Sequence, residues 1–153
     1  MSMTILTPAG VSNANTAVDS VSMPVTNSYV AATALTDLTV NTLAKWDATS
    51  SKMVVAGASD KPSHLYIAGT QWADGDTNYG MFVALGAGGI ISMVASGTIT
   101  IGDLVVVAAN GKVQALPNSA GNYYQIGQAI TGATADGQSI AVNSCVPIAV
   151  TIS

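Results

Sequence analysis

The chain contains no glutamate and no arginine, and it has only one cysteine, one histidine and one phenylalanine. Charged residues make up 8% of its 153 residues, against roughly 25% in an average soluble domain. Glu and Arg favour helices and usually cover exposed helix faces. Their absence, beside many Val, Thr, Ile and Gly residues, predicts an all-β protein. A single cysteine, Cys145, excludes a disulfide within the chain, and we interpret it as a small buried hydrophobe.

The low charge also excludes classes of partner. Four scattered lysines and a net charge of −4 provide no basic patch, so we expect no nucleic-acid binding. The surface must be covered instead with Ser, Thr, Asn, Gln and Ala. Such a surface loses few hydrated charges when it docks and is a solubility risk for a free monomer. This favours a protein that works inside an assembly.

The N-terminal residues 1–34 carry one charge and no lasting apolar period, which predicts an extended arm that becomes ordered against a partner. The first twenty residues hold no Lys or Arg and no continuous apolar run. We therefore expect no secretory leader and synthesis in a cytosol. The uncharged stretch 77–102 is long enough to cross a bilayer, but its glycines and alternating apolar residues indicate strands instead.

Residues 35–153 have the pattern of a β domain. Apolar alternation and turn residues predict short strands at 38–40, 52–56, 64–69, 81–85, 90–94, 99–101, 104–108, 112–116, 123–130, 139–142 and 146–152. Residues 86–89 are expected to be a hairpin loop, and Asn110-Gly111 a two-residue turn with positive φ. Pro147 lacks an N–H, so its strand is predicted to be an edge or to start there.

The two halves of this domain have similar patterns. A shift of 58 residues places Tyr66 on Tyr124, and residues 38–40 lie over 99–101 with a small gap. Two copies of one β unit could share a core that neither could form alone. We therefore predict a small β-sandwich or barrel made from two related units, 35–96 and 97–153, behind the extended N-terminal arm.

The run from Asp74 to Asn78 resembles the start of a calcium loop. An EF-hand needs Gly at the sixth position and Glu at the twelfth, where this chain has Tyr79 and Leu85. An EF-hand is thus excluded. We interpret the run as a solvated turn, and whether it binds an ion stays open.

Three other features are weighed as reactive groups. His64 follows Ser63, but no nucleophile-elbow motif is present and no His or Cys cluster could hold a metal, so we interpret His64 as structural. Lys112 follows a turn, as in lipoyl and biotinyl carriers, but it lacks their acidic or Met neighbour. The glycines at 86–89 lack the Lys-Ser/Thr of a phosphate loop. We therefore expect no enzyme activity, no cofactor and no metal.

Six of the aromatic residues could form a sugar-binding platform, although in small β domains aromatics more often pack in the core or at interfaces. The six are Trp46, Tyr66, Trp72, Tyr79, Tyr123 and Tyr124. A fibre, adhesin or carbohydrate-binding module, with Trp72 and Tyr79 exposed, is accordingly the first alternative function. A small hydrolase that uses His64 or an Asp pair is the second.

Four short strings in the last third of the chain resemble the repeated pattern of bacteriophage capsid decoration (cement) proteins. They are Gly102-Asp103-Leu104-Val105, Asn110-Gly111-Lys112-Val113, Ile126-Gly127-Gln128-Ala129 and Asp136-Gly137-Gln138. The residues that carry the resemblance are Gly102, Asp103, Asn110, Gly111, Lys112, Gly127, Asp136 and Gly137. Most of them define turns rather than chemistry.

The resemblance implies a non-enzymatic structural virion protein. It would be made in the host cytoplasm, form a homotrimer and bind the major capsid protein on the outer surface of the mature capsid. It would stabilise that lattice against internal pressure. We expect the arm, residues 1–34, to be one of its contacts.

Overall fold

The computed structural model describes residues 26–32, 38–71, 78–87 and 89–153. Within these ranges the chain forms ten strands and one 3₁₀ turn and no α-helix, which confirms the predicted all-β class. The elements are β1 (Thr26–Ala32), β2 (Leu43–Asp47), β3 (Lys52–Val55), β4 (His64–Gln71), β5 (Asn78–Ala84), β6 (Ile90–Val94), β7 (Leu104–Val107), η1 (Ala109–Gly111), β8 (Val113–Ala115), β9 (Gly121–Ala129) and β10 (Ser139–Ile152).

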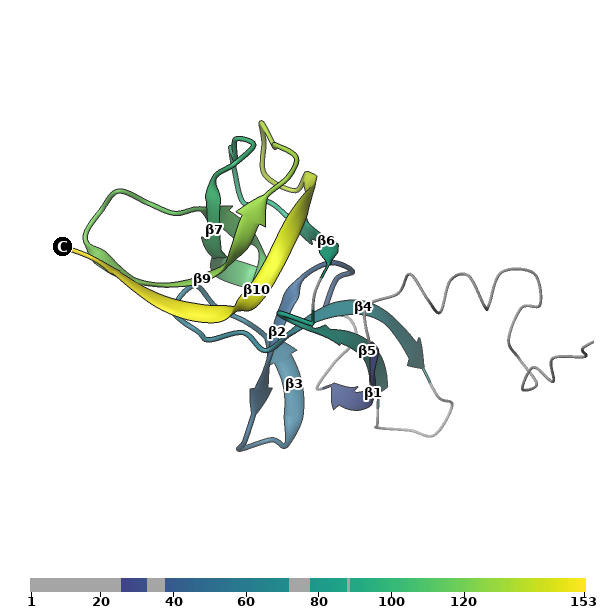
Figure 1. Cartoon of the computed structure of the whole chain (residues 1–153). Helices are drawn as coiled ribbons and strands as arrows, with labels where there is room; N and C mark the ends of the chain where they lie inside the picture. The colour runs from purple at the N-terminus through teal and green to yellow at the C-terminus, as the bar shows by residue number, and fades with distance from the viewer. Residues whose placement is uncertain (1–25, 33–37, 72–77, 88) are drawn as a thin grey trace, which may run out of the picture.

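The strands form two bodies that lie side by side (Figure 1). The first is a closed barrel with the order β1-β3-β2-β4-β5, in which β1 is parallel to β3 and antiparallel to β5. The second is a five-stranded sheet with the order β6-β10-β9-β7-β8. A parallel bridge between Ala95 and Val113 joins the end of β6 to the start of β8 and brings the outer strands of this sheet together.

The second sheet repeats the first. If β1 to β5 are matched in sequence order with β6 to β10, every neighbouring pair in the first barrel has a counterpart in the second sheet with the same direction. The chain therefore contains one β unit twice, as its sequence pattern indicates.

A turn before β2 recurs before β7 and fixes which residues correspond. Each turn makes the same two backbone hydrogen bonds to a later strand of its unit. In the first unit, Asn41 N–H donates to Tyr66 O of β4 and Tyr66 N–H donates to Thr42 O. In the second unit, Gly102 N–H donates to Ala129 O of β9 and Ala129 N–H donates to Asp103 O. Residues 38–40 thus correspond to 99–101, as predicted. Tyr66 corresponds to Ala129, so the shift that placed it on Tyr124 is wrong. The two tyrosines are the same residue type, but they lie at non-equivalent positions of their two units.

The unit boundaries also differ from the predicted ones. Residues 26–32, assigned to the arm, form β1 and pair with β3 and β5. Residues 90–94, assigned to the first half, form β6 and pair with β10. The expected hairpin around 86–89 is therefore wrong, because β5 pairs with β4 and β1 instead. That segment links the two units, and the predicted arm can apply only to residues 1–25, which lie outside the described residues.

Equivalent positions fill the interior of the two units. The first barrel encloses Leu38, Ala44, Met53, Tyr66 and Phe82. Strand pairing and the repeated turn match these with Ile99, Val105, Val113, Ala129 and Val142, which are also buried. A second, larger apolar cluster contains residues of both units, including Leu43 and Leu65 of the first. The units share a core, as expected for two small sheets that bury little surface alone.

The hairpin between β7 and β8 holds the two units together. Asn110 and Gly111 have φ of 57° and 69°, the positive values predicted for this turn, although the loop is the three-residue η1 rather than two residues. The Gly111 N–H donates to Ala56 O of the first unit at 2.8 Å. A Cβ at this position would lie 2.8 Å from Leu43 O, so only glycine permits the approach.

Pro147 lies inside a strand rather than at its start. β10 begins at Ser139, and its register against β9 shifts between Ser144 and Ile148. Beyond Asn143 the strand pairs with β9 alone, so this half of β10 is an edge, where a residue without an N–H is tolerated.

We predict that Gly127→Ala lowers the free energy of unfolding by about 1–3 kcal/mol, because overpacking a buried site has that cost. A Cβ at Gly127 would overlap the Asn143 carbonyl oxygen and lie 2.7 Å from Val142 Cγ1. Gly97→Ala is the matched control, since nothing lies within 4 Å of its added methyl. Urea unfolding of both variants measures the difference. Equal stability of the two would contradict the packing argument.

Candidate functional site

The eight residues that carry the family resemblance lie in the second unit, where Gly127 is part of β9 and the others lie in or beside turns. Gly102 has φ of 92°, and Asp103 closes the turn that leads into β7. The Asp103 carboxylate accepts the Thr100 N–H at 2.8 Å, and the Asp103 N–H donates to Thr100 O at 3.1 Å. These residues therefore fix the position of Leu104, the first residue of β7.

Lys112 forms an ion pair with Asp136. Its Nζ lies 2.8 and 3.0 Å from the two carboxylate oxygens, and the pair joins the β7–β8 hairpin to the connection between β9 and β10. Gly137, with φ of 83°, turns that connection back toward β10. An exposed ion pair of this kind is worth at most about 1 kcal/mol. Lys112 is thus a structural residue of the surface.

The motif residues do not converge on a reactive centre. Gly127 is buried between strands, Gly111 lies against the first unit, and the charged members are engaged in turns or with each other. Across the residues that the structure describes, no group of three His, Cys, Asp or Glu side chains could hold a metal ion.

His64 is a half-buried side chain with structural contacts. Its Nδ1 lies 2.8 Å from Ser63 Oγ, and its ring meets Phe82 edge-on with centroids 6.4 Å apart. Burial lowers the pKa of His64 below its ordinary value of 6.5. Within the described contacts no carboxylate orients the imidazole, so the arrangement lacks the third member of a hydrolase triad.

The remaining candidate groups are also held in place or shielded. Lys45 Nζ pairs with Asp60 at 2.7 Å, and this hydrogen bond lowers the pKa of the Asp60 carboxyl. Burial raises the pKa of the partly buried Cys145 thiol, which disfavours the reactive thiolate. The thiol is thus shielded, although Cys145 is only partly buried and not the buried hydrophobe expected from the sequence.

The expected aromatic platform is not assembled among the described side chains. Tyr66 is buried, Tyr123 and Tyr124 are partly buried, and Trp46 is 50% exposed at the end of the first barrel. Trp72 and residues 74–77 of the run that resembles a calcium loop lie outside the described residues, and so do the side chains of Asn78 and Tyr79.

What distinguishes the second unit is an exposed apolar surface with little charge. Of eight large hydrophobic side chains that are exposed in the described residues, six belong to this unit: Ile90, Ile101, Leu104, Ile130, Val146 and Ile148. Residues 90–153 contain only three charged side chains, and each is engaged with a neighbour. Exposed apolar side chains on a unit where charge is scarce favour docking.

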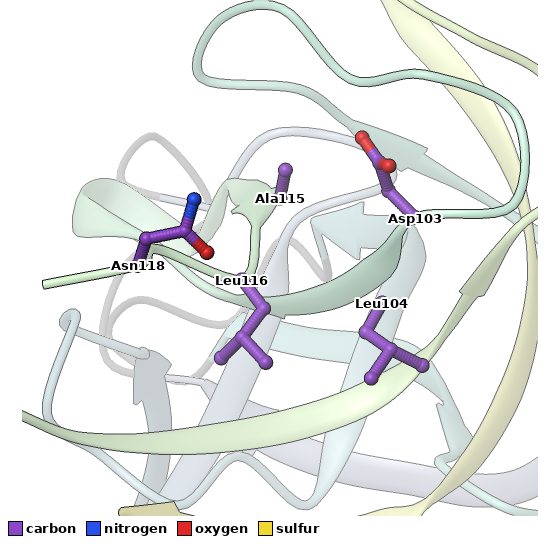
Figure 2. A pocket seen from close by; sticks show the side chains of 5 residues that line it. All are labelled: Asp103, Leu104, Ala115, Leu116 and Asn118. Atoms are coloured by element: carbon purple, nitrogen blue, oxygen red, sulfur yellow. The ribbon is translucent and has the colours of Figure 1, made fainter. Parts of the chain in front are cut away.

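A shallow, open hollow of about 370 Å³ lies on this surface (Figure 2). Leu104, at the start of β7, and Leu116, just after β8, lie side by side, since the Leu116 N–H donates to Leu104 O at 2.8 Å. Asp103, Ala115 and Asn118 complete the lining. The hollow can receive a side chain or a loop of a partner, but it is too open to enclose a small substrate.

Sequence reasoning placed Leu104 in a motif but did not identify it as exposed. Residues 104–107 are all apolar, so alternation gives no sign of which side chains face outward. Only the repeated turn, which sets the register of β7, shows that Val105 points inward and Leu104 outward.

Comparisons with protein-family models, with curated proteins and with solved structures found no match to this chain. Among the described residues, no helix has the length and apolar character needed to cross a membrane.

We predict that the single histidine titrates below its ordinary pKa of 6.5 and links stability to mild acid. Because the folded state depresses this pKa, the stabilisation is present above the unfolded value and is lost as pH falls through the folded one. An NMR titration of the His64 ring, with unfolding measured from pH 7 to 5, tests this. His64→Gln should flatten the pH dependence in that window. A ring pKa above 6.5 would show that burial does not control it.

Proposed function

We propose that this protein is a non-enzymatic structural virion protein that binds the outer surface of a mature phage capsid and stabilises its lattice. We propose further that it acts as a homotrimer and that its partner is the major capsid protein. The supporting observation is the charge-poor apolar surface of the second unit, where six large hydrophobic side chains are exposed.

That surface suits adhesion for an energetic reason. Docking removes water from both partners, and an uncompensated charge is costly to bury, whereas exposed apolar side chains gain on burial. Here the three charges of residues 90–153 already have partners within the chain. A flat lattice can therefore cover much of this surface without leaving a charge unpaired.

The family resemblance supports the identity of the partner. Two of its motif residues, Gly102 and Asp103, form the turn between Ile101 and Leu104, so they position two of the exposed apolar side chains. Lys112 and Asp136 tie the β7–β8 hairpin to the connection between β9 and β10 at the other end of β7.

The stabilisation would be thermodynamic rather than chemical. A protein that binds the assembled lattice but not free subunits shifts the equilibrium toward the assembled form by mass action. At a free concentration one hundred times Kd, this amounts to about 2.7 kcal/mol per site. Repeated over many sites, it would oppose the pressure of packaged DNA.

Co-sedimentation with undecorated mature capsids tests the proposal. We expect saturable pelleting with the mature shell and weak binding to the compact precursor shell. The double variant Ile101→Asp/Ile130→Asp should lose at least about tenfold in affinity, because it places charge in an apolar contact. Val40→Asp is the matched control, since Val40 is 54% exposed at the position of the first unit equivalent to Ile101.

Absence of pelleting by the wild-type chain would overturn the proposal and bring the recognition-module alternative to the front. Equal affinity of the double variant and the control would locate the contact elsewhere. Glycan binding by the chain would support that alternative directly.

The arm requires a separate test. Since residues 26–32 form a barrel strand, a deletion of 1–34 would damage the fold, whereas a deletion of 1–25 leaves β1 intact. We predict that the shorter deletion weakens pelleting while the unfolding transition is retained. Full-affinity decoration by the deleted chain would exclude the arm as a contact.

A further inference from the structure

The outer face of the first unit is buried by the second unit. Leu43, Leu65 and Val83 neighbour the barrel-lining residues Ala44, Tyr66 and Phe82 in sequence, so their side chains point to the opposite face. All three are nevertheless almost fully buried, and they belong to the apolar cluster that contains both units.

Backbone contacts show what covers this face. Gly111 of the second unit donates to Ala56 O, and Val94 donates to Asn41 O at 3.2 Å. The second unit therefore sits directly over the row that begins at Leu43. Within one chain, a unit of this fold is a good partner for that row.

The second unit has the same face, and the pairing identifies its residues. In the first unit Leu43 pairs with Leu65, Leu65 pairs with Val83, and Ala56 donates to Leu43 O. In the second unit the same connections run from Leu104 to Gln128, from Gln128 to Asn143, and from Leu116 to Leu104 O. Ile90 lies opposite Asn143 and ends the row.

This second face is open. Leu104 is 41% exposed, Ile90 is 61% exposed, and Gln128 and Asn143 between them are exposed as well. The hollow of Figure 2 lies at its Leu104 end. The row contains no charged side chain, so a partner that covers it would bury no unpaired charge.

We infer that this face, formed by Ile90, Asn143, Gln128, Leu104 and Leu116, binds a second copy of this chain. The equivalent face in the first unit is covered by a unit of the same fold, and another copy supplies such a unit. Gln128 and Asn143 replace Leu65 and Val83. These polar residues suit a surface that is exposed to water in the free monomer and buried in the assembly, because interfaces between chains are more polar than cores.

The contact is head to tail. The second unit already uses its Gly111 side to cover the first unit of its own chain, so the next copy presents its first unit to the open face. The matching turn of that unit has Ser51 in place of Gly111, so its approach differs from the one within the chain. An interface between unlike surfaces closes into a ring when the rotation between copies permits. This inference rests on the self-association in the proposed function and deepens it. It assigns Ile90 and Leu104 to the contact between copies, which leaves Ile101, Ile130, Val146 and Ile148 for the capsid.

Sedimentation velocity of the full chain, over a wide range of concentrations and without capsids, tests it. We expect the wild type to form a discrete assembly larger than its 15.3 kDa monomer. Leu104→Lys/Ile90→Lys should weaken that assembly at least about tenfold, because two charges enter an uncharged contact. Ile148→Lys is the matched control, since Ile148 is 54% exposed on the half of β10 outside this row.

If the wild type is monomeric at every concentration, the inference is overturned, and the open face is then a solvent-exposed cap at the end of the repeat. Assembly of the double variant as tight as that of the control would also overturn it. Slower amide exchange at residues 102–104 in the assembled sample than after dilution would support it. Capsid pelleting is measured in a separate experiment, so a failure of self-association can be told apart from a failure of capsid binding.

Discussion

The contact between the two units is the constraint on which the rest of the structure depends. Among the described side chains, five buried apolar residues fill the interior of the first barrel, and its outer row from Leu43 to Val83 is as apolar as its interior. Alone, this barrel would expose that row to water and would bury little else. The Gly111 turn brings the second unit close enough to cover it. Both the shared core and the placement of the open surface follow from this approach.

The contact also explains why two copies of one unit have diverged. The inward positions remain apolar in both, as Ala44 and Val105 or Phe82 and Val142 show. The outward positions differ, because those of the first unit lie in a core whereas those of the second face solvent. The position of Leu65 in the first unit is thus occupied by Gln128 in the second. The two units have the same strand order, and the difference between their outward residues gives one buried face and one open face.

Much of this could be predicted from the sequence. The all-β class followed from the missing Glu and Arg, and the positive φ of Asn110 and Gly111 followed from their residue types. What failed depends on distant pairing. The alignment placed Tyr66 on Tyr124 because the residue types match. The backbone hydrogen bonds, which set the register of the strands, match Tyr66 with Ala129 instead. Residues 26–32 show no lasting alternation, so their place in the barrel follows from pairing with β5. The exposure of Leu104 was hidden in a uniformly apolar strand.

The strand order has a consequence for how the chain folds. β6 lies early in the sequence of the second unit, yet its neighbour in the sheet is β10, about fifty residues later. During synthesis the first barrel can close once β5 is complete, whereas the edge of β6 stays unpaired until β10 is made. Such non-local pairing is slow, and an unpaired strand edge is prone to aggregation. A chain that ends before Ser139 would therefore keep the edge of β6 open.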